Sequence, residues 1–261
     1  MIDHMRLRVV LLTQGDVFHI PFALRRFFCR VDRELVDVTG LAILDPMNEH
    51  LPKLAARMLR FLGPADFVRR GGHYVLLRLL GWLGLTWRSP AVLARRNAVR
   101  ILNVRSVNSP EFIEYLRRER IHVIASISCP QILRATTLQA PCWGCLNVHS
   151  GRLPEYRGLM PCFWALYNGE DSVGVSVHTM VEEIDGGKII RRGDVPIRST
   201  DSWDLLVRRC KVIGGEMMAE ALGQIATGEE VLEEQVGGGV YYSFPDRSHV
   251  QEFKKCGGRI L

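Results

Sequence analysis

The sequence has no apolar run long enough to cross a bilayer. Its most apolar stretch, Val75–Trp87, has 13 residues and is interrupted by Arg78 and Thr86, whereas a spanning helix needs about 20 residues. Internal repeats and low-complexity tracts are also missing, which argues against a repeat protein or a disordered chain. Because apolar residues make up 47% and charged residues 24% of the 261 positions, we expect a globular protein with a sizeable core.

The cysteines do not form the pairs that a disulfide framework or a structural zinc site requires. Their number is seven, and we find no secretory signal near the N-terminus. We therefore expect reduced thiols in a cytoplasmic protein. Cys142 and Cys145 have the spacing of a zinc knuckle, but the second pair that zinc would need is missing. We predict ordinary buried cysteines and no metal site.

Acidic residues are scarce from Leu51 to Trp87, where Asp66 stands against six basic residues: Lys53, Arg57, Arg60, Arg69, Arg70 and Arg78. Two interpretations remain open. The segment forms either two amphipathic helices that cover one edge of a sheet, with solvated arginines, or a basic surface that rests on a membrane or grips an anionic substrate. We favour the first interpretation. The net charge of +6 suits many anionic partners and does not choose among them.

Short apolar runs alternate with helical stretches along most of the chain. We predict strands at Arg8–Thr13, Leu35–Leu44, Val99–Val104, Ile121–Ser126 and Cys145–His149, helices at Pro21–Phe28, Glu111–Glu119, Pro161–Tyr167 and Ser202–Thr227, and a hairpin of Val173–Met180 with Lys188–Pro196. This alternation predicts an α/β fold with a doubly wound, mostly parallel Rossmann-like sheet and flanking helices. We assign residues 1–236 to one catalytic domain with a basic helical insertion at about 51–88, and residues 237–261 to a short C-terminal extension.

Three polar residues far apart in the chain can meet at the end of one strand. Asn147 and His149 are two positions apart, so their side chains leave the same face of a strand that ends here. Asp185 lies 36 residues beyond His149, in a turn that can fold back over that strand end. An amide, an imidazole and a carboxylate around one pocket can stabilise an oxyanion and move protons during acyl transfer.

The residues around this trio carry a resemblance to a known family. The combined pattern is Asn147-x-His149, then Leu153-Pro154-x-Tyr156-Arg157-Gly158, then Asp185-Gly186-Gly187. It resembles the catalytic domain of 10-formyltetrahydrofolate-dependent formyltransferases, which include glycinamide ribonucleotide, methionyl-tRNA and sugar N-formyltransferases. The match covers residues 121–195, with weaker similarity at Leu7–Thr13.

The resemblance implies a role for each residue of the trio. Asn147 and His149 would stabilise the oxyanion formed when an amine attacks a formyl carbon. Asp185 would hold the imidazole or a water and help to remove the proton of the amine. We expect His178 to be structural and His19 to form a wall of the pocket.

The resemblance also implies where the donor and the acceptor bind. The family holds its folate largely through backbone groups of two loops, which correspond here to Ser126, Ile127 and Ser128, and to Val181, Glu182 and Glu183. Ser150 and Arg157 are our candidates for acceptor binding.

Departures from the family narrow the choice of acceptor. Asp16 would repel the phosphate of glycinamide ribonucleotide in the loop after the first strand. Little chain remains after residue 240 for the further domain of methionyl-tRNA formyltransferases, and the first strand begins near residue 7, which leaves no room for the N-terminal domain of formyltetrahydrofolate hydrolases. By elimination we predict a primary amine on an amino sugar that a nucleotide or lipid carries.

Other functions remain as alternatives. The protein could release formate from the donor as a hydrolase, or it could be a non-catalytic folate-binding or membrane-associated scaffold. We expect no nucleic acid partner, because the basic residues form no recognised motif. The sequence leaves open a peripheral membrane contact through 51–88 and a homodimer.

Overall fold

The computed structural model describes residues 6–45 and 51–261. The strands of its main sheet are β1 (Leu7–Gln14), β2 (Val36–Leu44), β3 (Ile101–Leu102), β4 (Val123–Ile127), β5 (Gly144–His149), β7 (Ser172–Thr179) and β8 (Ile189–Pro196). A second, small sheet pairs β6 (Tyr156–Gly158) with β9 (Val240–Tyr242). The helices are α1 (Ile20–Arg30), α2 (Leu51–Leu62), α3 (Pro64–Trp82), α4 (Pro90–Arg96), α5 (Pro110–Arg118), α6 (Ala135–Leu138), α7 (Pro161–Tyr167), α8 (Trp203–Thr227) and α9 (Arg247–Lys255).

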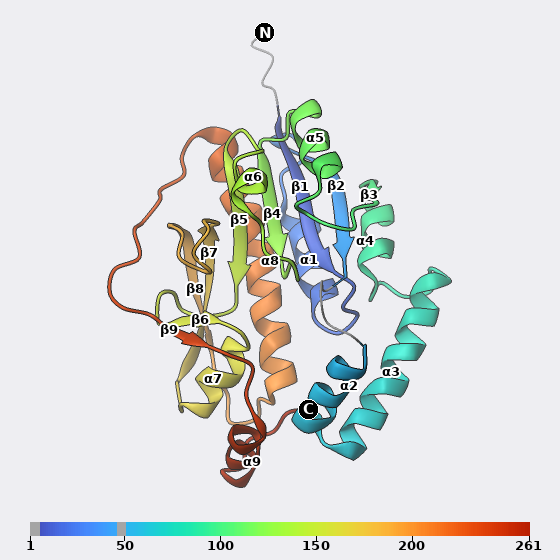
Figure 1. Cartoon of the computed structure of the whole chain (residues 1–261), viewed down its shortest axis with the longest axis vertical. Coiled ribbons are helices and arrows are strands. Elements are labelled where there is room, and N and C mark those ends of the chain that lie inside the picture. The colour runs from blue at the N-terminus through green and yellow to red at the C-terminus, as the bar shows by residue number, and fades with distance from the viewer. Residues whose placement is uncertain (1–5, 46–50) are drawn as a thin grey trace.

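The main sheet has the strand order β3-β2-β1-β4-β5-β7-β8 (Figure 1). The pairs from β3 to β5 are parallel, and β7 and β8 add an antiparallel edge. β1 is almost entirely buried, as expected for a central strand with helices on both faces. The predicted α/β fold with a doubly wound, mostly parallel sheet is therefore confirmed.

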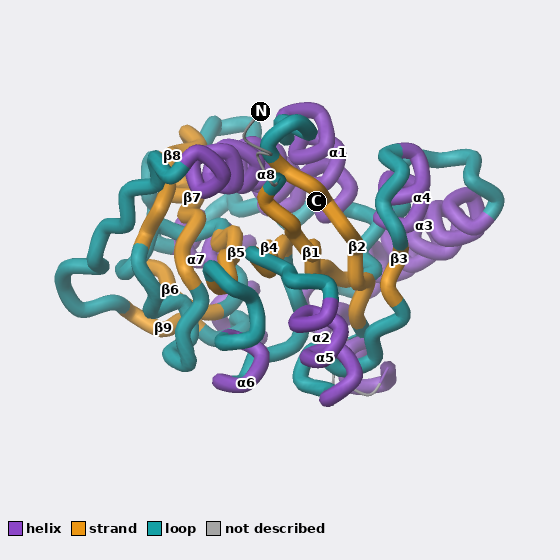
Figure 2. The backbone as a smooth tube through the Cα atoms, turned by 90° about the horizontal axis from the view of Figure 1, so that it is seen from above, coloured by secondary structure: helices purple, strands orange, loops and turns teal. Residues whose placement is uncertain are grey.

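Helices cover both faces of the sheet. In Figure 2, α1 and α8 lie on one face, and α5 and α6 lie on the other. Phe27 of α1 and Leu222 of α8 belong to the larger core cluster, whereas Phe112 and Leu116 of α5 belong to the cluster on the opposite face. α8 begins after Ser202, whose hydroxyl accepts a hydrogen bond from the N–H of Leu205, which is a standard N-cap.

The C-terminal part of the chain packs against the insertion. A third cluster joins Phe61 and Leu62 of α2, Phe163 of α7 and Phe253 of α9. The backbone N–H of Trp203 donates to the carbonyl of Arg259, so the first turn of α8 is also tied to the end of the chain. These contacts place α2 against the body of the molecule.

Several sequence predictions need correction. The strand expected at Val99–Val104 is only two residues long, because Ala98, which has a positive φ, precedes it and a turn follows it. α4, β6, β9 and α9 were not predicted, since short elements carry little periodicity. Cys145 is buried as expected, whereas Cys142 is exposed in the turn before β5.

The segment 51–88 does form two helices, α2 and α3. α2 contributes to the third core cluster, but only Leu77 and Gly81 of α3 are buried. α3 lies at the periphery of the molecule in both views, beyond the β2–β3 edge (Figures 1 and 2). No helix in the described part of the chain is long and apolar enough to cross a membrane.

Candidate active site

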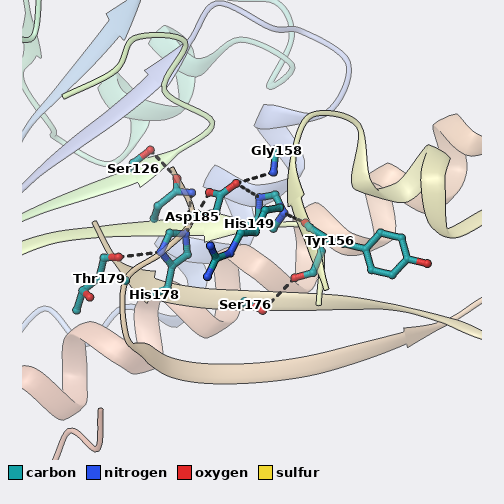
Figure 3. Close-up of polar contacts among 12 residues, drawn as sticks. Ser126, His149, Tyr156, Gly158, Ser176, His178, Thr179 and Asp185 are labelled. Carbon is teal, nitrogen blue, oxygen red and sulfur yellow. Dashed lines mark hydrogen bonds and ion pairs between the residues drawn. The ribbon is translucent and has the colours of Figure 1, made fainter. Parts of the chain in front are cut away.

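A row of polar side chains crosses three neighbouring strands. Ser126 of β4 is in register with Asn147 of β5, and Asn147 is in register with His178 of β7. The Ser126 hydroxyl donates to Asn147 Oδ1 at 2.8 Å, and Asn147 Nδ2 donates to His178 Nε2 at 3.2 Å. Because His178 Nδ1 lies 2.8 Å from the carbonyl of Thr179, the neutral ring carries its proton on Nδ1 and accepts at Nε2. The row therefore fixes the orientation of the Asn147 amide. Ser126 and His178, the residues on either side of Asn147, are labelled in Figure 3.

His149 is held by a backbone carbonyl. Its Nε2 donates to the carbonyl of Tyr156 at 2.6 Å, so Nδ1 of the neutral ring is free to accept a proton. Gly151 makes this contact possible, because a Cβ there would lie 2.6 Å from His149 Nε2 and 2.7 Å from the Tyr156 oxygen. The imidazole is buried at the end of β5, with its proton-accepting nitrogen turned towards Asp185 (Figure 3).

The carboxylate of Asp185 joins the two histidines. Oδ2 lies 3.6 Å from His149 Nδ1 and Oδ1 lies 3.5 Å from His178 Nε2. The N–H of Gly158 donates to Oδ2 at 2.9 Å. Asp185 has a φ of 54°, a left-handed conformation that non-glycine residues adopt at some energetic cost and that often marks functional sites.

The loop that presents Asp185 is fixed at both ends of its tip. The Gln235 side chain donates to the carbonyls of Asp185 and Gly187, each at 2.7 Å. A Cβ at Gly187 would lie 1.8 Å from the carbonyl oxygen of Thr179, so only glycine fits there. The position of the carboxylate therefore depends on close backbone packing and on a side chain 50 residues further along the chain.

The two ionisable groups of the trio have shifted pKa values. Burial lowers the pKa of His149 below its ordinary value, although the Asp185 charge and the Tyr156 carbonyl oppose this. Burial raises the pKa of Asp185, but His178, the charge that His149 carries when it is protonated and the Gly158 N–H outweigh burial and hold this pKa at about 2. At neutral pH the site thus contains a neutral imidazole beside an ionised carboxylate.

A second group of charges, here called the Asp204 cluster, lies at the loop after β1 and the start of α8. It consists of Asp16, His19, Arg70, Asp204 and Arg208. Asp204 accepts from His19 Nε2 at 2.9 Å and forms ion pairs with Arg70 and Arg208, while His19 Nδ1 lies 3.2 Å from Asp16. Burial lowers the pKa of His19, but the two carboxylates outweigh burial and raise it. The ring is therefore part of an ion network rather than a simple wall.

Lys211 lies between the Asp204 cluster and the trio. Its Nζ donates to the Ser128 hydroxyl at 2.6 Å, in the loop after β4. Burial lowers the pKa of Lys211, and its charge in turn lowers the pKa of His149. Asp204, Arg208 and Lys211 are spaced i, i+4 and i+7, so they share one face of α8 over roughly 10 Å.

The structure brings the predicted catalytic residues together. The residues predicted to bind the donor differ in their position and exposure. Ser126 belongs to the polar row, and Ser128 contacts Lys211, but the Ile127 side chain is buried in the core. Val181, Glu182 and Glu183 are exposed on the segment that leads to Asp185.

The two residues predicted to bind the acceptor also differ. Arg157 is engaged by Glu183 and by Gln235 Oε1, so it braces the Asp185 loop. The hydroxyl of Ser150 is buried and has no hydrogen-bond partner among the described residues. A ligand could satisfy that hydroxyl, whereas Arg157 would first have to release its protein partners.

Sequence reasoning missed several residues of the site. His178 was expected to be structural, yet its ring contacts both Asn147 and Asp185. Gln235 and Lys211 carried no motif. Strand register identifies His178, the packing of α8 identifies Lys211, and the bonds to the carbonyls of Asp185 and Gly187 identify Gln235.

Comparisons with known proteins agree with the residue pattern. Residues 87–222 match the sequence profile of a family described as Formyl transferase. The chain is 35% identical to a methionyl-tRNA formyltransferase of Citrifermentans bemidjiense over 144 residues, which cover 55% of this chain and 45% of that protein. It is also 35% identical to a methionyl-tRNA formyltransferase of Thermotoga maritima over 143 residues, which cover 55% of this chain and 46% of that protein. The chain therefore spans about half the length of the curated relatives it matches.

Solved structures of low sequence identity share the fold. A glycinamide ribonucleotide transformylase from Symbiobacterium toebii superimposes with a TM-score of 0.61 at 20% identity, covering 89% of this chain and 93% of that one. A sugar N-formyltransferase from Shewanella superimposes with a TM-score of 0.59 at 17% identity, covering 95% of this chain and 87% of that one. An N-formyltransferase from Helicobacter canadensis superimposes with a TM-score of 0.58 at 14% identity, covering 98% of this chain and 84% of that one. That structure was solved with folinic acid and dTDP-3-aminofucose.

Proposed function

This chain belongs to the formyl transferase family of enzymes, and from that premise we propose that it moves a formyl group from 10-formyltetrahydrofolate to a primary amine on an amino sugar. A nucleotide or a lipid carries that sugar. The observation that supports this most strongly is the convergence of Asn147, His149 and Asp185, with Asp185 within 3.6 Å of the His149 ring.

Asn147 is suited to stabilise the oxyanion. Its amide nitrogen carries two N–H groups, and the bond to His178 uses one of them. The second N–H can donate to the oxygen on which negative charge develops. Because Ser126 and His178 hold both ends of the amide, this donor is already oriented before the reaction, which is the condition for effective oxyanion stabilisation.

His149 is the better proton acceptor of the two ionisable groups. A carboxylate whose pKa is about 2 is a weak base at neutral pH, whereas a neutral imidazole is well matched to it. In the proposed step Nδ1 of His149 takes the proton of the attacking amine. The imidazolium then has two acceptors, the Tyr156 carbonyl and the Asp185 carboxylate, and it can return the proton to the departing nitrogen.

The donor would bind at the two loops that flank the polar row. It supplies an activated formyl carbon. Ser128 is placed at one loop by its positive φ of 61° and by Lys211, and the exposed backbone of Val181–Glu183 forms the other. The relative from Helicobacter canadensis was solved with folinic acid, which supports a folate at this site.

The test is an assay with the purified chain, 10-formyltetrahydrofolate and a panel of amines. The panel includes nucleotide-linked and lipid-linked amino sugars as well as methionyl-tRNA, and mass spectrometry identifies the formylated product. We expect tetrahydrofolate release that depends on an amino sugar. Formate release without any amine would support the hydrolase instead, and folate binding without turnover across the panel would support the non-catalytic scaffold.

Two features bear on the remaining partners. The curated relatives are named methionyl-tRNA formyltransferases, so tRNA belongs in the panel even though we propose no nucleic acid partner. A homodimer remains a proposal that light scattering would test. We also propose a peripheral membrane contact through the segment 51–88.

A further inference from the structure

α3 carries a continuous apolar stripe on its outer side. Val68, Val75, Leu79 and Trp82 are exposed to 72%, 65%, 52% and 80%. Their spacings of seven, four and three residues place them on one side of the helix. Leu76 and Leu83, also exposed, widen the stripe. Contiguous exposed apolar surface of this kind usually marks an interaction site.

The inner side of α3 fixes the direction in which the stripe faces. Arg70 pairs with Asp204, and its guanidinium lies 3.7 Å from the centre of the Phe18 ring. Leu77 is buried, and a Cβ at Gly81 would lie 3.0 Å from Ser89, so the helix approaches its neighbour closely there. The body of the molecule therefore holds one side of α3 and leaves the apolar stripe on the other side exposed. Figure 1 shows α3 at the periphery of the molecule.

We propose that α3 lies in the interface of an anionic lipid bilayer with the stripe inserted among the lipids. The segment 51–88 has seven basic residues and one acidic residue. Arg70 is paired with Asp204 on the inner side of α3, and the excess of basic residues that remains suits a negatively charged surface. An exposed tryptophan at the end of an apolar stripe is typical of helices that bind in the interface plane. Such a stripe would be poorly suited to RNA, whose phosphates and riboses need polar partners.

The same helix connects the membrane surface to the active site. Its inner residue Arg70 belongs to the Asp204 cluster, and a Cβ at Gly15 would lie 3.4 Å from the Arg78 guanidinium. The face of α8 that carries Asp204, Arg208 and Lys211 then leads to Ser128. The proposed membrane contact rests on the proposed function and specifies its acceptor, because an amine on a lipid carrier would reach the site from the bilayer.

The test uses vesicles and two matched double variants of the full chain. Val75→Glu/Leu79→Glu places two charges in the stripe. Ile101→Glu/Ile132→Glu makes the same change at two exposed apolar residues outside both α3 and the proposed catalytic trio. We expect wild type and the control to sediment with phosphatidylglycerol vesicles, and the stripe variant to bind about tenfold more weakly or worse. Circular dichroism confirms that each variant is folded.

Four outcomes would overturn the inference. Two come from the vesicle assay: absence of binding to anionic vesicles at low salt, and equal binding by the wild type and the stripe variant. The third is a soluble dimer that the stripe variant alone dissociates, since the stripe would then bind a second copy. The fourth is binding of tRNA that the stripe variant abolishes, since RNA would then be the occupant of the stripe.

Activity separates the two proposals. Vesicle binding needs no turnover, so it can succeed even if no amine is formylated, in which case the proposed function alone fails. With a lipid-borne amino sugar in vesicles, we expect the stripe variant to lose rate by about the factor by which it loses binding. With a water-soluble amine, its rate should equal that of the control.

Discussion

The candidate active site and α3 differ in how the rest of the molecule holds them. Asn147 lies in a row set by strand register and is held at both ends of its amide. α3 is attached by a few side chains and leaves most of its apolar residues exposed. The site is therefore held by many contacts within the chain, whereas α3 leaves an apolar surface that the proposed bilayer would cover. Variants that change one region and leave the other intact test this difference.

The largest expected effect is on catalysis, from Asn147→Ala. Removing the oriented donor should lower kcat by about 100- to 1000-fold, because this hydrogen bond strengthens mainly in the transition state. Steady-state rates at saturating donor and amine measure the loss. Asn103→Ala, at an exposed asparagine, is the control, and vesicle binding should be the same in both variants. A change of less than tenfold in kcat would remove Asn147 from the role proposed here.

Asp185→Asn should reduce the rate by about 100-fold and alter its pH dependence. Because burial lowers the pKa of His149, the wild-type rate should fall only at a pH below the ordinary histidine value of 6.5. The Asp185 charge raises the His149 pKa, so its removal should move this acidic limb to still lower pH. An acidic limb that moves towards higher pH would contradict the proposed charge interaction.

The same shift has a consequence for stability. A histidine whose pKa is lowered on folding contributes stability that is present above pH 6.5 and is lost as the pH falls through the folded-state value. Denaturant titrations at a series of pH values give the free energy of unfolding of wild type and His149→Gln. Plotted against pH, the two free energies should differ in slope only in that acidic window.

Gly187→Ala should destabilise the Asp185 loop by about 1–3 kcal/mol, because the added Cβ would overlap the Thr179 carbonyl and overpacking typically has this cost. Chemical unfolding measures the change. Gly223→Ala in α8 is the control, since nothing lies within 4 Å of its Cβ and alanine should stabilise a helix by about 0.5–1 kcal/mol. Equal stability of the two variants would show that the loop can relax.

The smallest effect is expected from Arg70→Met. Asp204 keeps His19 and Arg208 as partners, so the free energy of unfolding should fall by only about 1 kcal/mol. Hydrogen exchange in α3 should accelerate while exchange in β4 and β5 stays unchanged. Arg69→Met, which removes an exposed pair with Asp66, is the matched control. Unchanged exchange in α3 would mean that other contacts hold the helix.

The sequence predicted the sheet and the trio because both leave local signals. Apolar runs mark the strands, and the pattern from Asn147 to Asp185 marks the chemistry. It did not predict His178 as a partner of Asn147, because that contact depends on strand order rather than spacing. Gln235 was not predicted because it contacts the Asp185 loop from a segment without helix or strand structure, 50 residues further along the chain.

The exposure of α3 had a different cause. Apolar residues at helical spacing usually pack against a core, so the sequence alone favoured a covering helix over an exposed one. The division between residues 1–236 and 237–261 remains a prediction, although α9 packs on α2 and α7 and β9 pairs with β6.

The strap from residue 229 to 239 runs along the outside of the molecule before it reaches β9 (Figure 1). Glu233 pairs with Ile189, and Gln235 grips the Asp185 loop from outside. A single protease cut in this strap would leave the sheet folded but release the carboxylate from its place. The catalytic geometry thus depends on a tether that contributes little to the core, so activity can fail before the fold does.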